Sequence, residues 1–124
     1  MATELKTLTP DTPILEAVDF LLNGRISGAP VLDDTGALVG IISEKDCLRL
    51  VARGVDNDIP AGVVGDFMTT EVQTVPPSMD IYYCAGLFLK NVYRRLPVVE
   101  DGRLVGQVSR RDLLRAMREG LDAL

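Results

Sequence analysis

The sequence predicts an α/β (α+β) fold in which two pseudo-twofold-related β-α-β-β-α repeats pack through their small sheets. The main observation is an internal repeat: "APVLDD" aligns with "LPVVED", and "GALVGIISEKDCLRLVARG" aligns with "GRLVGQVSRRDLLRAMREG". Nine of the nineteen positions in the longer alignment are identical. The second observation is that strand and helix patterns follow one another in the same order in both copies. We therefore expect a first repeat over residues 1–62, including the start of a linker, and a second over residues 63–124.

Each copy opens with a short predicted strand, "LKTL" or "VQTV", a turn at proline and a helix. In the first copy we expect Thr12 to cap the helix and Pro13 to be its first residue, because a helix needs no N–H there. Gly24 and Asn91 are the expected helix ends. Apolar residues then fall on one helical face in each copy. They are Ile14, Ala17, Val18, Leu21 and Leu22 in the first, and Ile81, Cys84, Ala85, Phe88 and Leu89 in the second.

A β-hairpin and a second helix complete each predicted repeat. The hairpins join "APVL" to "ALVGII" and "LPVV" to "RLVGQV" through turns rich in aspartate and glycine. The second helix is expected to begin at Ser43 or Ser109 and to end near Gly54 or Gly120. The intervening "VDNDIPAGVVGDFMTTE" predicts a linker that ends in a short helical turn at 66–68. A single copy is too small to cover both faces of its sheet, so the two together are expected to form one globular module.

The composition favours a folded protein and argues against several classes of function. Hydrophobic residues make up 47% of the 124 positions, and no apolar run has the length of a membrane span. The N-terminus lacks a signal-peptide pattern, which predicts a cytoplasmic location. Cys47 and Cys84 lie in apolar helical patterns and are expected to be buried thiols in a reducing compartment. The chain has no histidine, which argues against hydrolase and metal-site chemistry.

The charge distribution indicates a small anionic ligand. The net charge of −5 argues against nucleic-acid binding through the phosphate backbone. Residues 1–62 hold ten acidic and five basic residues, whereas residues 63–124 hold eight of each. The basic residues of the second half concentrate between Arg94 and Arg118. A local cationic patch on an acidic protein suits a small anion better than a polymer.

The repeated Ser-x-x-Asp pattern has a structural interpretation and a functional one. It occurs as "SEKD" at Ser43 and Asp46 and as "SRRD" at Ser109 and Asp112. Structurally it is a capping box, in which serine and aspartate satisfy the free amides of a helix start, and most such patterns do nothing more. Functionally, free helix amides attract an anion, and a carboxylate can accept bonds from the two hydroxyls of a ribose. The pair of sites therefore fits a nucleotide.

Arginines make the second half the stronger candidate for phosphate binding. Arg94 and Arg95 precede the hairpin proline of the second copy, where the first copy has Ser27 and Gly28. Guanidinium groups bind phosphate oxygens in a bidentate manner, so we expect the main phosphate contact near Arg95 and Asp112. Single surface arginines are usually only solvated. Two further arginines lie inside the second Ser-x-x-Asp, at Arg110 and Arg111.

The stretches "RISGAPVLDDTGALVGIISEKDCL", "YRRLPVVEDGRLVGQVSRRDLL" and "VGDFMT" resemble the cystathionine β-synthase (CBS) domain family, paired as a Bateman module. The resemblance implies a regulatory module with a ligand cleft between its repeats, no required cofactor and AMP, ADP, ATP or S-adenosylmethionine as regulator. It also implies a homodimer and a regulated partner protein whose identity is unknown. The ligand contacts that it implies are Ser43, Asp46, Ser109 and Asp112 in the repeated motif, Ile26, Ser27, Gly28, Tyr93, Arg94 and Arg95 before the hairpin prolines, and Thr7 and Thr74 at the ends of the first strands.

Two other classes of function stay open at this point. The chain can be a structural or dimerisation module without a ligand, in which both Ser-x-x-Asp pairs act only as caps. An enzyme is disfavoured, because the sequence offers no recognisable pair of nucleophile and base. The tyrosines Tyr82, Tyr83 and Tyr93 are expected to pack rather than to transfer protons.

Overall fold

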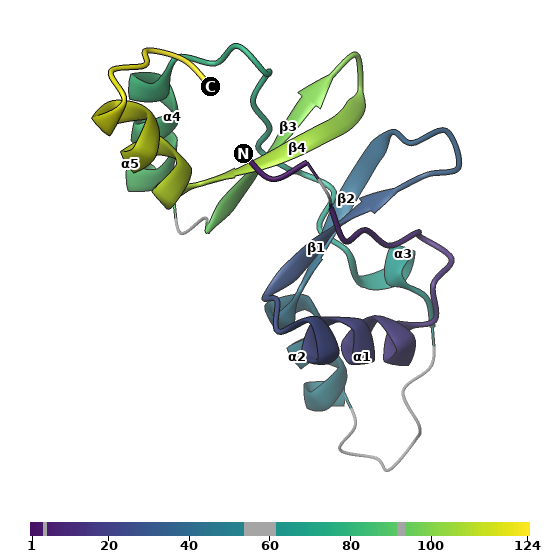
Figure 1. Ribbon diagram of the computed structural model, residues 1–124. Helices are drawn as coiled ribbons and strands as arrows, with labels where there is room; N and C mark the ends of the chain where they lie inside the picture. The colour runs from purple at the N-terminus through teal and green to yellow at the C-terminus, as the bar shows by residue number, and fades with distance from the viewer. Residues whose placement is uncertain (4, 54–61, 92–93) are drawn as a thin grey trace. The chain divides into compact units, whose positions relative to one another are not determined.

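The computed structural model describes residues 1–3, 5–53, 62–91 and 94–124, and these form two compact units (Figure 1). The first-repeat unit is Lys6–Val72, and the second-repeat unit joins Met1–Leu5 to Gln73–Leu124. Each unit combines helices with one two-stranded antiparallel sheet, which confirms the predicted mixture of helix and strand. The predicted repeat boundary at residues 62 and 63 and the packing of one sheet on the other stay predictions.

The first-repeat unit contains a hairpin and helices in the predicted order. Strands β1 and β2 pair antiparallel with Gly28 opposite Ser43. The Asp33 carboxylate closes the turn, since its Oδ1 accepts bonds from the N–H and hydroxyl of Thr35 and the N–H of Ala37. The elements are α1 (Ile14–Gly24), β1 (Gly28–Leu32), β2 (Leu38–Ser43), α2 (Glu44–Arg53) and α3 (Val64–Phe67).

The second-repeat unit reproduces this plan with a shorter turn. Arg95 lies opposite Ser109, and the register of both hairpins shifts by one residue near the turn end. Asp101 and Gly102 form this turn with φ angles of 53° and 80°. Aspartate and glycine are the residues that tolerate such left-handed angles. The elements are α4 (Ile81–Lys90), β3 (Arg95–Glu100), β4 (Arg103–Ser109) and α5 (Arg110–Arg118).

Each unit has its own hydrophobic core, built from one sheet face and the apolar stripes of its helices. Because alternate residues of a strand point to opposite faces, Val31 and Ile42 in one unit and Val98 and Val108 in the other are fully buried. The first core contains Leu8, Ile14, Ala17, Leu21, Ala29, Val31, Ile42, Leu50, Val64 and Phe67. The second contains Val75, Ile81, Cys84, Phe88, Leu96, Val98, Val108, Leu113 and Ala116.

Two local predictions are corrected by the structure. The predicted opening strands are reduced to single parallel bridges, Leu8 with Val31 and Val75 with Val98, because the following prolines leave no room for a ladder. Helix α1 begins at Ile14 rather than at Pro13, which takes the extended ψ of 138° as N-cap residue. The Thr12 hydroxyl instead accepts a bond of 3.3 Å from the N–H of Thr9.

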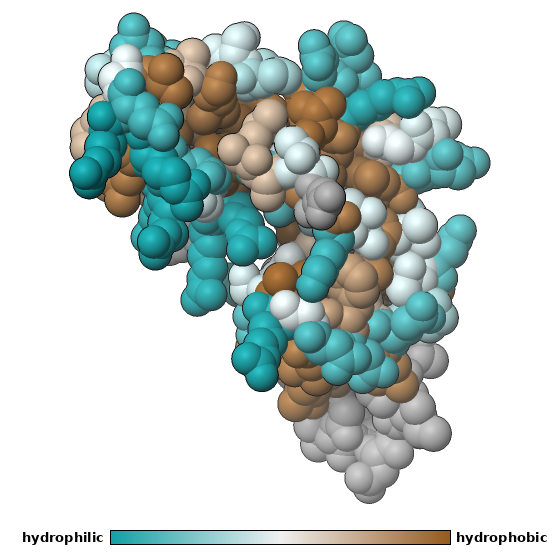
Figure 2. Space-filling view, in the orientation of Figure 1, coloured by the Kyte–Doolittle hydropathy of each residue, from teal (hydrophilic) through white to brown (hydrophobic). Residues whose placement is uncertain are grey.

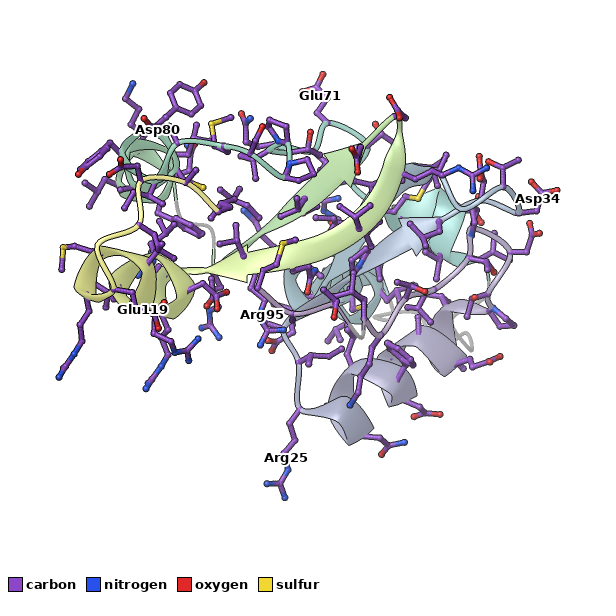
Figure 3. All side chains as sticks on the ribbon, turned by 45° about the horizontal axis from the view of Figure 1, so that its top comes forward. Arg25, Asp34, Glu71, Asp80, Arg95 and Glu119 are labelled. Carbon is purple, nitrogen blue, oxygen red and sulfur yellow. The ribbon has the colours of Figure 1, made fainter. Side chains whose placement is uncertain are left out.

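The predicted helix ends agree with the structure where it describes them. Gly24 is the last residue of α1, and Arg25 takes the left-handed conformation after it, with a side chain that projects away from the fold (Figure 3). Asn91 caps α4 as predicted. Gly120 follows α5 with φ of 75°, one residue after its C-cap. The predicted end of the other second helix, Gly54, lies outside the described residues.

The short helix of the inter-repeat segment begins earlier than predicted. It spans Val64–Phe67 rather than residues 66–68. The Val63 N–H donates a bond of 3.0 Å to Asp66 Oδ2 at the helix start. Val64 and Phe67 enter the core of the first-repeat unit, which fixes this segment beside the sheet.

A matched edge contact extends each hairpin. Thr69 exchanges two backbone hydrogen bonds of 2.8 and 2.9 Å with Ile41 on β2. Ala2 exchanges two of 3.0 Å with Gln107 on β4. Ala2 in "MATE" and Thr69 in "MTTE" thus make matched contacts, so the repeat includes the first residues of the sequence. The segment around Ala2, which precedes the first repeat, is therefore part of the second-repeat unit. The segment around Thr69, which precedes the second repeat, is part of the first-repeat unit.

Candidate functional site

Ser43 and Asp46 form the predicted capping box at the start of α2. The N–H and hydroxyl of Ser43 donate bonds of 2.9 and 2.8 Å to Asp46 Oδ2. The N–H of Asp46 donates one of 3.2 Å to the Ser43 hydroxyl. One carboxylate oxygen is therefore committed to the helix start, as the structural interpretation of the motif requires.

The second oxygen of Asp46 is also occupied. Its Oδ1 accepts a bond of 3.1 Å from the hydroxyl of Thr69 and one of 3.4 Å from Arg49. Two backbone bonds to Ile41 hold the Thr69 backbone against β2, which brings its hydroxyl within reach of Asp46. The Asp46 side chain is only 3% exposed. Its carboxylate thus has a protein partner on each oxygen.

Ser109 and Asp112 repeat the capping box at the start of α5 but leave the carboxylate more accessible. The N–H and hydroxyl of Ser109 donate bonds of 2.7 and 3.0 Å to Asp112 Oδ2. Asp112 Oδ1 lies 3.1 Å from Arg115 and 3.9 Å from the Met1 ammonium. The Asp112 side chain is 18% exposed and that of Arg115 is 66% exposed. Both partners of this oxygen are therefore cations, and Arg115 reaches it from solvent.

The electrostatic environment keeps Asp112 ionised. Partial burial alone would raise the pKa of its carboxyl, since desolvation disfavours the charge. The hydrogen bonds from Ser109 and the positive charges of the N-terminus and Arg115 outweigh this effect, and the net pKa is lowered. At neutral pH the group is therefore an anion that can only accept hydrogen bonds, as the binding of a diol requires.

The predicted neighbours of Asp112 gather at the same end of the β3–β4 hairpin. Arg95 is exposed and pairs across the sheet with Ser109. Arg94 and Arg110 flank these two residues along the chain and are exposed as well. Thr74 is partly buried and precedes Val75, whose N–H donates to the Pro97 carbonyl of β3. Figure 3 labels Arg95 at the start of β3.

The matched residues of the first-repeat unit gather in the same way but bring no cation of their own. Gly28 pairs with Ser43, and the Ser27 carbonyl accepts a bond of 2.9 Å from the N–H of Glu44. Ile26 is partly buried and packs against the core. Thr7 is partly buried and precedes Leu8. Tyr93, also predicted as a contact, lies outside the described residues.

Sequence reasoning missed the four residues that engage the second carboxylate oxygens: Thr69 and Arg49 at Asp46, and Arg115 and Met1 at Asp112. Two signals were present. The motif continues in both copies as Ser-x-x-Asp-x-x-Arg, a spacing that brings the arginine back to the aspartate on one helical turn. The alignment of "MATE" with "MTTE" contrasts an alanine with a threonine. Only the pairing of these segments with β4 and β2 reveals what that contrast does.

The described part of the chain presents no alternative centre. Among those residues, no group of three or more aspartate, glutamate, cysteine or histidine side chains could hold a metal ion. No helix within the described ranges has the length and apolar character to cross a membrane. Burial raises the pKa of the Cys84 thiol, and burial together with Asp46 and Glu44 raises that of Cys47. Both cysteines are free thiols. Because their pKa values are raised, little of either thiol is ionised at neutral pH, and both are weak nucleophiles.

Comparison with protein families finds a match to a model described as "CBS domain" over residues 1–53 and 64–119. Among curated proteins, an uncharacterised protein of Methanocaldococcus jannaschii is 32% identical over 111 residues, which are 90% of this chain and 39% of the relative. CBSX2, a chloroplastic CBS domain-containing protein of Arabidopsis thaliana, is 31% identical over 138 residues, or 90% of this chain and 58% of the relative. The chain thus spans less than two thirds of the length of both proteins.

Solved structures give the same result for the fold. The crystal structure of CBSX2, a CBS-pair protein from Arabidopsis thaliana, has a TM-score of 0.82 with 33% identity and covers 96% of this chain and 91% of its own. The crystal structure of CBSX2 in complex with AMP has a TM-score of 0.80 with 34% identity and covers 96% and 92%. The predicted resemblance and fold class are therefore confirmed.

Proposed function

Because the chain belongs to the CBS domain family and contains two CBS domains in tandem, we propose that it is a regulatory module that binds an adenine nucleotide. The proposed ligand is AMP, ADP, ATP or S-adenosylmethionine, and no other cofactor is required. The observation that carries this proposal is the group of Arg95, Ser109 and Asp112 at one end of the β3–β4 hairpin. CBSX2, a similar protein, has been crystallised with AMP.

The chemistry of this group suits a nucleotide. Asp112 Oδ1 supplies an acceptor for the ribose hydroxyls, while the guanidinium groups of Arg95, Arg94 and Arg110 supply charge for the phosphates. The start of α5 adds the positive end of a helix dipole. Ligand binding would favour one arrangement of the module, and a partner protein would sense the difference. The partner and a cytoplasmic location are parts of the same proposal.

Asp112→Ala is expected to weaken AMP binding at least tenfold while the protein stays folded. The substitution removes the proposed ribose acceptor, whereas loss of one helix cap costs only about 1 kcal/mol of stability. Isothermal titration calorimetry with AMP, ADP, ATP and S-adenosylmethionine measures the affinity, and a thermal-shift series confirms stabilisation of the native state.

Asp122→Ala is the matched control for this experiment. Asp122 is an exposed acid of the same unit, so its removal changes the net charge equally and leaves the site intact. AMP affinity close to wild type in Asp122→Ala, with a tenfold loss in Asp112→Ala, supports the proposal. Saturating nucleotide that neither stabilises the wild-type protein nor gives a binding isotherm would refute it.

A ligand-free dimerisation scaffold is the second candidate, and exposed apolar side chains on the helices favour it. Leu48 and Val51 on α2 are 62% and 73% exposed, and Leu114 and Met117 on α5 are 62% and 64% exposed. Figure 2 shows brown apolar side chains at the surface among the polar ones. Such faces are typical of association between copies.

The scaffold candidate predicts a dimer whose mass does not depend on nucleotide. Light scattering of the wild-type protein and of a Leu48→Glu and Leu114→Glu double variant is expected to give a dimer and a monomer, respectively. A monomeric wild-type protein at micromolar concentration would contradict the proposed homodimer. Calorimetry on the same samples decides separately whether a nucleotide binds.

A further inference from the structure

The two aspartates of the repeated motif, Asp46 and Asp112, differ in the partners of their Oδ1 atoms. Each Oδ1 meets the arginine three positions later, Arg49 at 3.4 Å or Arg115 at 3.1 Å, but Asp46 Oδ1 also accepts a hydrogen bond of 3.1 Å from the neutral hydroxyl of Thr69. At the matched place on the second-repeat unit stands Ala2, which has no hydroxyl. Ala2 and Thr69 make the same pair of backbone bonds, to Gln107 and Ile41 respectively, so their side chains start from equivalent positions. The same backbone arrangement thus occurs in both units, but only the first-repeat unit has a hydroxyl at this position.

The difference in burial follows this difference in side chains. The Asp46 side chain is 3% exposed, whereas that of Asp112 is 18% exposed. A ligand at Asp46 would have to replace a hydrogen bond from a residue that the backbone holds in place. A ligand at Asp112 would meet an oxygen whose partners are charged and partly solvated: Arg115, 66% exposed, and the Met1 ammonium at 3.9 Å. A buried acceptor that already has its partner gains nothing by exchanging it.

We infer that the two copies of the motif are functionally unequal. The Thr69 hydroxyl occupies Oδ1 of Asp46 and keeps it from a ligand, so the module binds one nucleotide per chain, through Asp112. This inference rests on the proposed nucleotide function and assigns to Thr69 and Ala2 the choice between the two sites. Asp46 is then a structural residue that attaches the inter-repeat segment to α2. The absence of cations at Ser27 and Gly28, where the other copy has Arg94 and Arg95, agrees with this assignment.

The first test is the stoichiometry of binding. Calorimetry with AMP on the full chain is expected to give one site per chain. Asp112→Asn is expected to lose at least tenfold in affinity, and Asp46→Asn is expected to keep wild-type affinity. Two equivalent sites per chain, or an equal loss in both variants, would overturn the inference and leave the proposed nucleotide function standing.

The second test places the missing hydroxyl on the other copy. Ala2→Thr is expected to lower AMP affinity about tenfold, because its hydroxyl reaches Asp112 Oδ1 as that of Thr69 reaches Asp46 Oδ1. Ala2→Val is the matched control, since valine has the shape of threonine without the hydroxyl, and it is expected to bind as the wild type does. Thermal melts of both variants establish that they are folded.

The outcomes separate the inference from the function on which it rests. Equal AMP affinity for Ala2→Thr and Ala2→Val would overturn the role of the hydroxyl while binding by the wild type still supports the module's function. A wild-type protein that binds none of the four nucleotides would overturn both. One site per chain, lost in Asp112→Asn and weakened in Ala2→Thr alone, supports the inference.

Discussion

Asp46→Ala is expected to lower the free energy of unfolding by about 3 kcal/mol, the largest effect among the variants considered. The carboxylate is 3% exposed and accepts bonds from the N–H and hydroxyl of Ser43, from Thr69 and from Arg49. Its loss removes a helix cap, worth about 1 kcal/mol, and the hydrogen bonds that Thr69 and Arg49 donate to a buried charged acceptor, worth about 1.5–3 kcal/mol. Urea unfolding followed by circular dichroism measures the change.

Asp112→Ala provides the comparison, because the same capping box is present in a more exposed setting. Its side chain is 18% exposed, and water can solvate Arg115 once the carboxylate is gone. We expect a loss of about 1 kcal/mol, the usual effect of removing a cap. Equal losses in the two alanine variants would contradict a special structural role for Asp46.

Gly40→Ala is expected to destabilise the protein by about 2 kcal/mol. A Cβ at this position would lie 2.9 Å from the Thr69 carbonyl oxygen and 2.8 Å from Met68 Sδ. The methionine can move, but the Thr69 carbonyl belongs to the backbone bonds with Ile41 and cannot move without weakening them. Overpacking of this kind typically costs about 1–3 kcal/mol. Urea unfolding and hydrogen exchange at the Ile41 amide measure the effect.

Gly86→Ala is the matched control with the opposite sign. Gly86 lies inside α4, and nothing surrounds the position that its Cβ would take within 4 Å. Alanine is the better helix former, so a gain of about 0.5–1 kcal/mol is expected. A stability loss in Gly86→Ala, or a neutral Gly40→Ala, would show that these backbone contacts are not decisive.

Local patterns predicted those elements that depend on neighbouring residues. The two hairpins, the starts of α2 and α5 and the Asn91 cap are confirmed because alternation, turn residues and capping boxes act within a few positions. The same reasoning placed the start of α1 one residue early, since Pro13 can serve either as N-cap or as first helical residue. The opening strands were overestimated because "LKTL" and "VQTV" alternate but have a single partner residue each.

The inequality of the two carboxylates could not be predicted from the motif. "SEKDCLR" and "SRRDLLR" have the same capping residues and the same arginine. What distinguishes Asp46 from Asp112 comes from Thr69 and Ala2, and Thr69 lies 23 positions away from Asp46. The pairing of these segments with the hairpins is a tertiary contact, and sequence periodicity does not predict tertiary contacts. The roles of the predicted ligand contacts stay predictions until binding is measured.

The attachment of Ala2 to β4 bears on any attempt to dissect the chain. Expression of residues 63–124 alone would remove Ala2, which pairs with the edge of β4. The backbone N–H and carbonyl of Gln107 would then lose their partners. An exposed edge strand of this kind favours self-association. A half-molecule that keeps this contact has to include the segment around Ala2, so the two homologous halves of the sequence are not the two compact units of the protein.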